Sequence, residues 1–108
     1  MNWVPVCRHD RLQPERGVAA LVGGTQVAIF LTYDGNLFAI DNLDPHSHAY
    51  VMARGIVGTR GGAPTLASPM HKQVYDLRTG ACLDLPGVTV RTHDIRLRDG
   101  WVEVRCPT

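Results

Sequence analysis

Short apolar runs, separated by glycine, proline and polar turn residues, divide this chain from one end to the other. Short β-rich runs with regular turn signals are typical of a sandwich or barrel, whose strands are brief and whose turns need these residue types. No stretch has the 3.6-residue periodicity of a long amphipathic helix. The pattern therefore predicts an all-β domain with an antiparallel sandwich or barrel.

The first part of the chain predicts an edge strand at 3–6 and then three strands at 18–22, 26–31 and 37–40. Pro5 places the first run at a sheet edge, because proline cannot donate a ladder hydrogen bond. The pair Gly23-Gly24 favours a tight hairpin between the next two runs. Together the three later strands form a predicted antiparallel meander.

The last part of the chain predicts a hairpin. Residues 93–98 alternate polar and apolar side chains, and residues 101–104 return with the same alternation. Asp99-Gly100 between them is a strong signal for a two-residue turn, since both residue types tolerate positive φ angles. We expect His93 to point outward from the first of these strands, and His9 and His48 to lie in solvated loops.

The middle of the chain is different. Residues 41–64 have little periodicity and predict one helical turn at 51–54, followed by short strands at 65–68 and 73–77 and a turn at 78–80. A long irregular segment inside a compact domain is often functional. This segment is therefore the predicted location of the functional residues.

Composition narrows the classes of protein that fit. A chain of 108 residues predicts a single domain, 1–108, and a net charge of +1 argues against nucleic acid or an anionic membrane as partner. We expect no membrane segment, because the longest apolar stretch is too short to cross a bilayer. The odd set Cys7, Cys82 and Cys106, without a visible secretion signal, predicts reduced thiols and a cytoplasmic location.

Two segments of the middle region, 42–48 and 67–80, resemble the metal-binding loops of Rieske ferredoxins, in which each loop supplies one cysteine and one histidine. His46 and His71 match the histidine positions, whereas Asp44 and Ser68 stand where the cysteines would be. A Rieske centre takes two thiolates and two imidazoles. Since oxygen donors are poor replacements for thiolates, we predict that no [2Fe–2S] cluster is bound.

Three interpretations of these residues remain open. Asp44 and Ser68 fit structural roles in tight turns, where Asp and Ser are favoured. Asp44, His46 and His71 also fit a two-histidine, one-carboxylate site for a single metal ion. The third interpretation is a Rieske-type, ferredoxin-like electron carrier that assembles a cluster with unusual ligands.

Four segments, 41–45, 54–58, 68–73 and 80–84, are similar to the small subunit of the cytoplasmic NAD(P)H-dependent nitrite reductase, a Rieske-like family without cluster cysteines. The resemblance implies a Rieske-like fold with two loops at one tip and a loop-bearing subdomain at 41–84. It also implies a large-subunit partner that carries FAD, an iron–sulfur cluster and sirohaem and reduces nitrite to ammonia. This chain is then an accessory subunit with no cofactor and no catalytic residue of its own.

A docking surface is a further expectation from the sequence. Arg54, Arg60 and Lys72 flank the two loop segments in the sequence and are candidate residues for contact with the partner. A solvated surface without a partner is an equally simple interpretation of each of them alone.

Overall fold

The computed structural model describes residues 2–106, and within this range the chain is almost entirely β-structure. Short strands and two 3-10 turns account for its regular elements. In chain order they are β1 (Val4–Arg8), η1 (His9–Arg11), β2 (Val18–Val22), β3 (Thr25–Leu31), β4 (Leu37–Asp41), η2 (Met52–Arg54), β5 (Ile56–Arg60), β6 (Ala63–Ala67), β7 (Val74–Asp76), β8 (Thr92–Arg98) and β9 (Trp101–Arg105).

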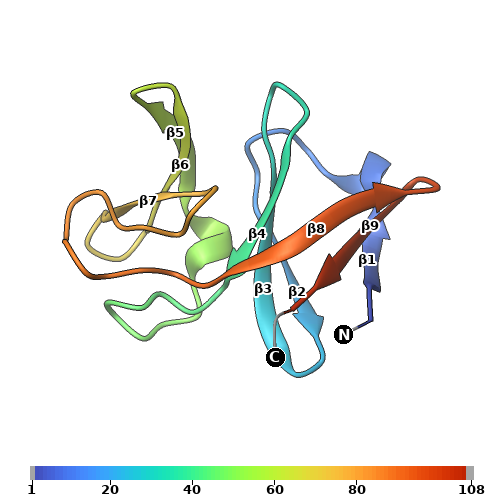
Figure 1. The fold of residues 1–108 in the computed structure, drawn as a ribbon, viewed down its shortest axis with the longest axis horizontal. Coiled ribbons are helices and arrows are strands. Elements are labelled where there is room, and N and C mark those ends of the chain that lie inside the picture. The colour runs from blue at the N-terminus through green and yellow to red at the C-terminus, as the bar shows by residue number, and fades with distance from the viewer. Residues whose placement is uncertain (1, 107–108) are drawn as a thin grey trace.

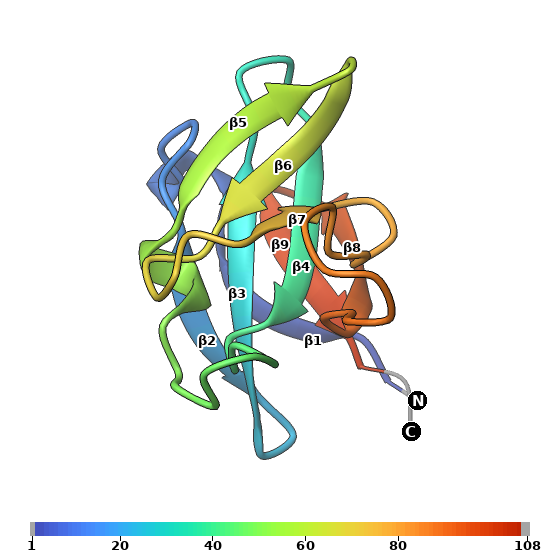
Figure 2. The same cartoon turned by 90° about the vertical axis from the view of Figure 1, so that its left-hand side faces the viewer.

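The strands form two antiparallel sheets. The larger has six strands in the order β1-β9-β8-β4-β3-β2, and it curls so that its edge strands β1 and β2 approach each other. The smaller has the order β5-β6-β7 and lies beside β3 and β4 at one end of the molecule (Figures 1 and 2). The predicted all-β antiparallel architecture is confirmed.

Strand β3 forms a wall between two hydrophobic cores. Val27, Ile29 and Leu31 pack into a core within the curled six-stranded sheet. Ala28 and Phe30 point the other way, into a second core shared with the smaller sheet. Because both faces are covered, the strand is a continuous apolar run, as expected of a strand buried on two sides.

Two predicted hairpin turns are confirmed in position and conformation. Gly23 and Gly24 have φ angles of 54° and 85°, and Asp99 and Gly100 have 54° and 82°. Positive φ at both central residues is the type I′ geometry, which matches the twist of the paired strands. The predicted helical turn at 51–54 corresponds to η2, whose Met52 is fully buried.

Strand β5 is absent from the predicted elements, because the sequence around it has no alternating pattern. It is the edge strand of the smaller sheet and is largely exposed, so its side chains carry no burial signal. Gly61 and Gly62, at φ angles of 59° and 82°, connect it to β6 in a third tight hairpin. The region 41–84, expected to bear the loops, thus contains all three strands of the smaller sheet. The described part of the chain has no helix long and apolar enough to span a membrane.

The prediction that His93 points outward is wrong. Its side chain is completely buried, and its Nε2 donates a hydrogen bond to the Asp41 carboxylate at 2.7 Å. His93 is in phase with Ile95, which packs into the core, so both side chains lie on the inner face of β8. Its Nδ1 is buried and has no hydrogen-bond partner among the described residues.

Candidate functional site

Two loops meet at the end of the molecule that carries the smaller sheet. The first follows β4 and contains His46, and the second follows β6 and contains His71. The two imidazole rings approach edge to face, with their centroids 5.2 Å apart. This arrangement is the expected one, with two loops at one tip.

Asp44 is the centre of the first loop. The residue is fully buried, and its Oδ1 accepts hydrogen bonds from the backbone N–H groups of His46 at 2.8 Å and Ser47 at 3.1 Å. Its own backbone is tied into the same turn, because its N–H donates to Ala49 O and its carbonyl accepts from His48 N, both at 2.8 Å. One carboxylate therefore holds the loop in a tight turn, as aspartate commonly does.

Ser68 joins the second loop to the first. Its buried hydroxyl donates a hydrogen bond to Asp44 Oδ2, across 24 positions of the sequence, and accepts one from Met70 N at 3.2 Å. Its backbone N–H closes the second loop by donating to Gln73 O at 2.8 Å. These bonds are those of structural turn residues, and the link between the loops was not predicted from the sequence.

The environment of Asp44 keeps its carboxylate ionised. Burial acts to raise the pKa, but hydrogen bonds from Ser68, from His46 N and from Ser47 together outweigh it, and the net pKa lies below the usual value. The buried Tyr75 lies nearby, and burial together with the negative charge of Asp44 raises the pKa of its phenol to about 12. A charge-assisted hydrogen bond in such a site is stronger than one between neutral groups.

The donor set at the tip does not fit a Rieske-type cluster. Such a cluster needs two thiolates, and the candidate loop positions offer the oxygens of Asp44 and Ser68, which are bonded to each other. The three thiols lie elsewhere, with Cys7 in β1, Cys82 buried opposite Tyr75 and Cys106 after β9.

A mononuclear site of Asp44, His46 and His71 also lacks support from the geometry. Both carboxylate oxygens of Asp44 already accept hydrogen bonds within the loops, so metal coordination would have to replace these bonds. Across residues 2–106 no cluster of three His, Cys, Asp or Glu side chains has a geometry suited to holding a metal ion.

The exposed part of the tip carries backbone strain. His48, His71 and Lys72 have φ angles of 62°, 63° and 59°, in the left-handed region that residues with a Cβ seldom occupy. Conformations of this kind persist where surrounding bonds enforce them, and they concentrate at functional sites. Here the Asp44–Ser68 bond is part of the frame that holds both loops.

The three basic candidates for docking do not lie together. Lys72 is exposed in the second loop, and Arg54 is exposed in η2, next to the end of β5 that adjoins this loop. Arg60 lies at the other end of β5, beside the hairpin turn, where it forms an ion pair with Asp84 at 3.2 Å. Arg60 therefore does not flank the loops in space. The length of β5 separates it from the loop end of the smaller sheet, although it is near the loop segments in the sequence.

Comparison with known proteins places this fold and site in a family. The chain matches the Rieske-like [2Fe-2S] domain over residues 2–105. It is 40% identical over 105 residues to the nitrite reductase (NADH) small subunit of Salmonella typhimurium, covering 96% of this chain and 97% of that protein. A solved structure described as an NADH-dependent nitrite reductase small subunit from Mycobacterium tuberculosis superposes with a TM-score of 0.94 at 44% identity, covering 99% of this chain and 97% of that one.

The same domain also occurs inside a longer chain. The nitrite reductase [NAD(P)H] large subunit of Klebsiella oxytoca is 35% identical to this sequence over 102 residues, which are 94% of this chain and 11% of that protein. The domain is therefore found both as a separate polypeptide and as a small part of a large one. The chain belongs to the Rieske-like domain family and, within it, to the nitrite reductase small subunits.

Proposed function

We propose that this chain is the small accessory subunit of a cytoplasmic NAD(P)H-dependent nitrite reductase and supports the reduction of nitrite to ammonia by a large subunit. The single observation that carries this role, beyond family membership, is the bond between Asp44 and Ser68. This bond joins the two loops and fixes the shape of the surface that they present. Because Asp44 and Ser68 occupy the positions of the cluster cysteines, the loops supply no thiolate ligands to a redox centre. The chain then contributes binding and stability, and electron transfer belongs to the partner.

The partner in this proposal is the large subunit, and it carries FAD, an iron–sulfur cluster and sirohaem. The relative in Klebsiella oxytoca supports such an association, because a domain like this one is there joined covalently to the rest of a nitrite reductase. A separate chain must reach the same partner by non-covalent contact. Arg54 and Lys72, both exposed near the loops, are candidates for that contact.

Co-expression with the large subunit tests this function. We expect the two chains to co-purify and the complex to reduce nitrite faster, or to retain activity longer, than the large subunit alone. The matched control is the large subunit expressed without this chain. Failure to co-purify, together with unchanged nitrite reductase activity, would contradict the accessory role.

A second measurement separates the accessory subunit from an electron carrier. The isolated chain is expected to be colourless, with no stoichiometric iron or sulfide. A visible spectrum of a [2Fe–2S] centre, with iron and sulfide in equal amounts and reversible reduction, would replace the accessory role with electron transfer.

A further inference from the structure

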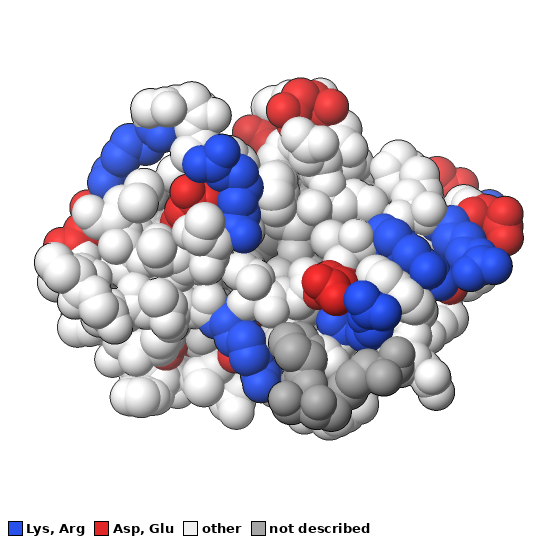
Figure 3. Space-filling view, viewed as in Figure 1, with Lys and Arg blue, Asp and Glu red and all other residues white. Residues whose placement is uncertain are grey.

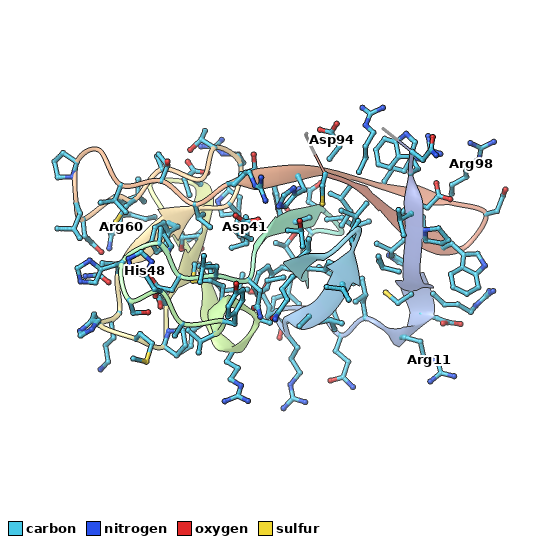
Figure 4. All side chains as sticks on the ribbon, turned by 90° about the horizontal axis from the view of Figure 1, so that it is seen from below. Arg11, Asp41, His48, Arg60, Asp94 and Arg98 are labelled. Carbon is cyan, nitrogen blue, oxygen red and sulfur yellow. The ribbon has the colours of Figure 1, made fainter. Side chains whose placement is uncertain are left out.

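Both tryptophans and four of the arginines lie on one face of the six-stranded sheet, at the end opposite the loops. This arginine–tryptophan face belongs to the segment before β1 and to strands β1, β9 and β8, and consists of Trp3, Arg8, Arg96, Arg98, Trp101 and Arg105. The alternate residues of β9, Val102 and Val104, are fully buried on the other face. Figure 3 shows basic side chains gathered where Figure 1 places these strands, and Figure 4 shows Arg98 and His48 at opposite ends of the molecule.

One half of this face is internally satisfied. The guanidinium groups of Arg96 and Arg105 lie 4.1 Å and 4.6 Å from the centre of the Trp3 ring. Arg96 also pairs with Glu103 at 2.7 Å, and Arg105 pairs with Asp94 at 2.8 Å. These groups are held in place and neutralised by their own neighbours, so this half supplies a rigid platform.

The other half has unused binding capacity around Trp101. The strand register places Arg8 on one side of Trp101 and Arg98 on the other. Trp101 is 41% exposed, and the Arg8 guanidinium lies 5.5 Å from the centre of its ring. Arg8 has only a long contact of 3.9 Å with the exposed Asp10, and Arg98 has no ion pair within residues 2–106. Beside them lies a groove of about 240 Å³, lined by Pro5, Arg98, Asp99, Trp101 and Glu103. Glu103 is already neutralised by its ion pair with Arg96.

We propose that Trp101, Arg8 and Arg98 form a docking site for an acidic segment of the large subunit, an inference that rests on the proposed function. Two guanidinium groups without strong internal partners suit carboxylates, and the ring between them suits an apolar side chain. Tryptophan and arginine are the residue types that most often carry the binding energy of protein interfaces.

Local charge disfavours two other occupants. Two copies packed with their Trp101 rings together would bring the Arg8 and Arg98 groups on either side of each ring against one another, and such like-charge contact costs energy in an interface. In a nucleic acid, a run of phosphates would also meet Asp10 and Asp99, which lie at the edge of the site. A protein segment with one or two carboxylates can place them against Arg8 and Arg98 and turn uncharged residues toward Asp10 and Asp99, which a continuous run of phosphates cannot do.

Charge reversal in the co-expressed complex tests this site. Arg8→Glu and Arg98→Glu are each expected to raise the Kd for the large subunit by about ten-fold, because each removes an interfacial charge pair and adds repulsion. Arg98→Lys is expected to have a smaller effect, since it retains the charge and loses the planar guanidinium. The matched control is Arg16→Glu, which reverses an exposed charge in the loop between η1 and β2. Thermal unfolding of each isolated variant checks that the fold is retained.

Each outcome distinguishes the site from the function. If the wild-type chain binds the large subunit and both reversals bind equally well, the docking site is wrong and the accessory function stands. Weaker binding by Lys72→Glu, with Arg8→Glu and Arg98→Glu both binding as tightly as the wild type, would place the contact at the loops and overturn the site. A wild-type dimer that Arg98→Glu dissociates, or binding of DNA at physiological salt, would assign the face to another occupant. If the wild-type chain does not bind the large subunit, the function and the site both fail.

Discussion

The six-stranded sheet and the two-loop tip are held together by different kinds of interaction. In the sheet, β3 buries aliphatic and aromatic side chains on both faces, and this burial is non-directional. At the tip, one buried carboxylate, Asp44, receives hydrogen bonds from its own loop and from Ser68 of the other loop. Apolar packing thus supplies most of the stability, while directional polar bonds determine the shape of the exposed loops.

The largest effect is expected from breaking the packing between the two sheets. Phe30 is fully buried in the core shared with the smaller sheet. Phe30→Ala should lower the free energy of unfolding by about 3–5 kcal/mol, from lost burial and the cavity left behind. Urea unfolding measures the change. The control Leu21→Ala removes a side chain that is 69% exposed and should change stability by less than about 0.5 kcal/mol.

A smaller and more local loss is expected from removing the acceptor at the tip. Asp44→Ala leaves the Ser68 hydroxyl and two loop amides without their partner and should cost about 2–3 kcal/mol. Hydrogen exchange should accelerate in both loops and change little in β3. Equal acceleration in β3 would contradict the separation between the sheet and the tip.

Acid should remove the contribution that the ionised Asp44 makes to stability at the tip. The pKa of Asp44 in the folded chain is held below its usual value, so its stabilising effect is complete above the unfolded pKa of about 3.9. That contribution is lost as the pH falls through the folded pKa. Below about pH 4 the wild-type chain should therefore lose stability more steeply than Asp44→Asn. Parallel pH profiles from urea titrations of the two proteins would refute this assignment.

Removing only the bond between the loops should cost less. Ser68→Ala deletes the donor to Asp44 and the acceptor of Met70 N, and about 1–2 kcal/mol is expected. Because Asp44 keeps its two bonds to loop amides, exchange should accelerate mainly in the second loop. Thermal unfolding and site-resolved hydrogen exchange together measure both effects.

The smallest effect is expected from removing a buried hydroxyl that forms no hydrogen bond in the described part of the chain. Tyr75 is fully buried, and its hydroxyl has no hydrogen-bond partner among the described residues. Tyr75→Phe should leave stability within about 0.5 kcal/mol of wild type or slightly higher, since it removes an unsatisfied polar group and retains the ring. A loss of more than about 1 kcal/mol would show that the hydroxyl has a partner, such as water.

The sequence predicted the sheet better than the tip, for physical reasons. Strands β3, β8 and β9 have local hydrophobic patterns. The hairpin turns beside them contain glycine and aspartate, which tolerate the positive φ angles observed there. The error at His93 was avoidable, because its position in the alternation with Ile95 indicates the inner face. Strand β5 carries no such pattern, since an exposed edge strand buries few side chains.

The residues of the tip could be predicted, but their interaction could not. Asp44 and Ser68 could be singled out because they stand where Rieske ferredoxins carry cysteines, and turn formation is a local property of these residue types. The bond between them joins residues 24 positions apart and depends on how the two sheets pack. Separation of Arg60 from the loops likewise follows from the direction of β5, which local sequence does not reveal.

Because β3 lies between two cores, the smaller sheet and its loops depend on a strand of the larger sheet. Ala28 and Phe30 belong to a strand of the larger sheet, yet they form part of the hydrophobic core against which the smaller sheet packs. A peptide of residues 41–84 would lack these core side chains and should not fold when excised. Grafting the loops onto another scaffold therefore requires transplanting β3 with them.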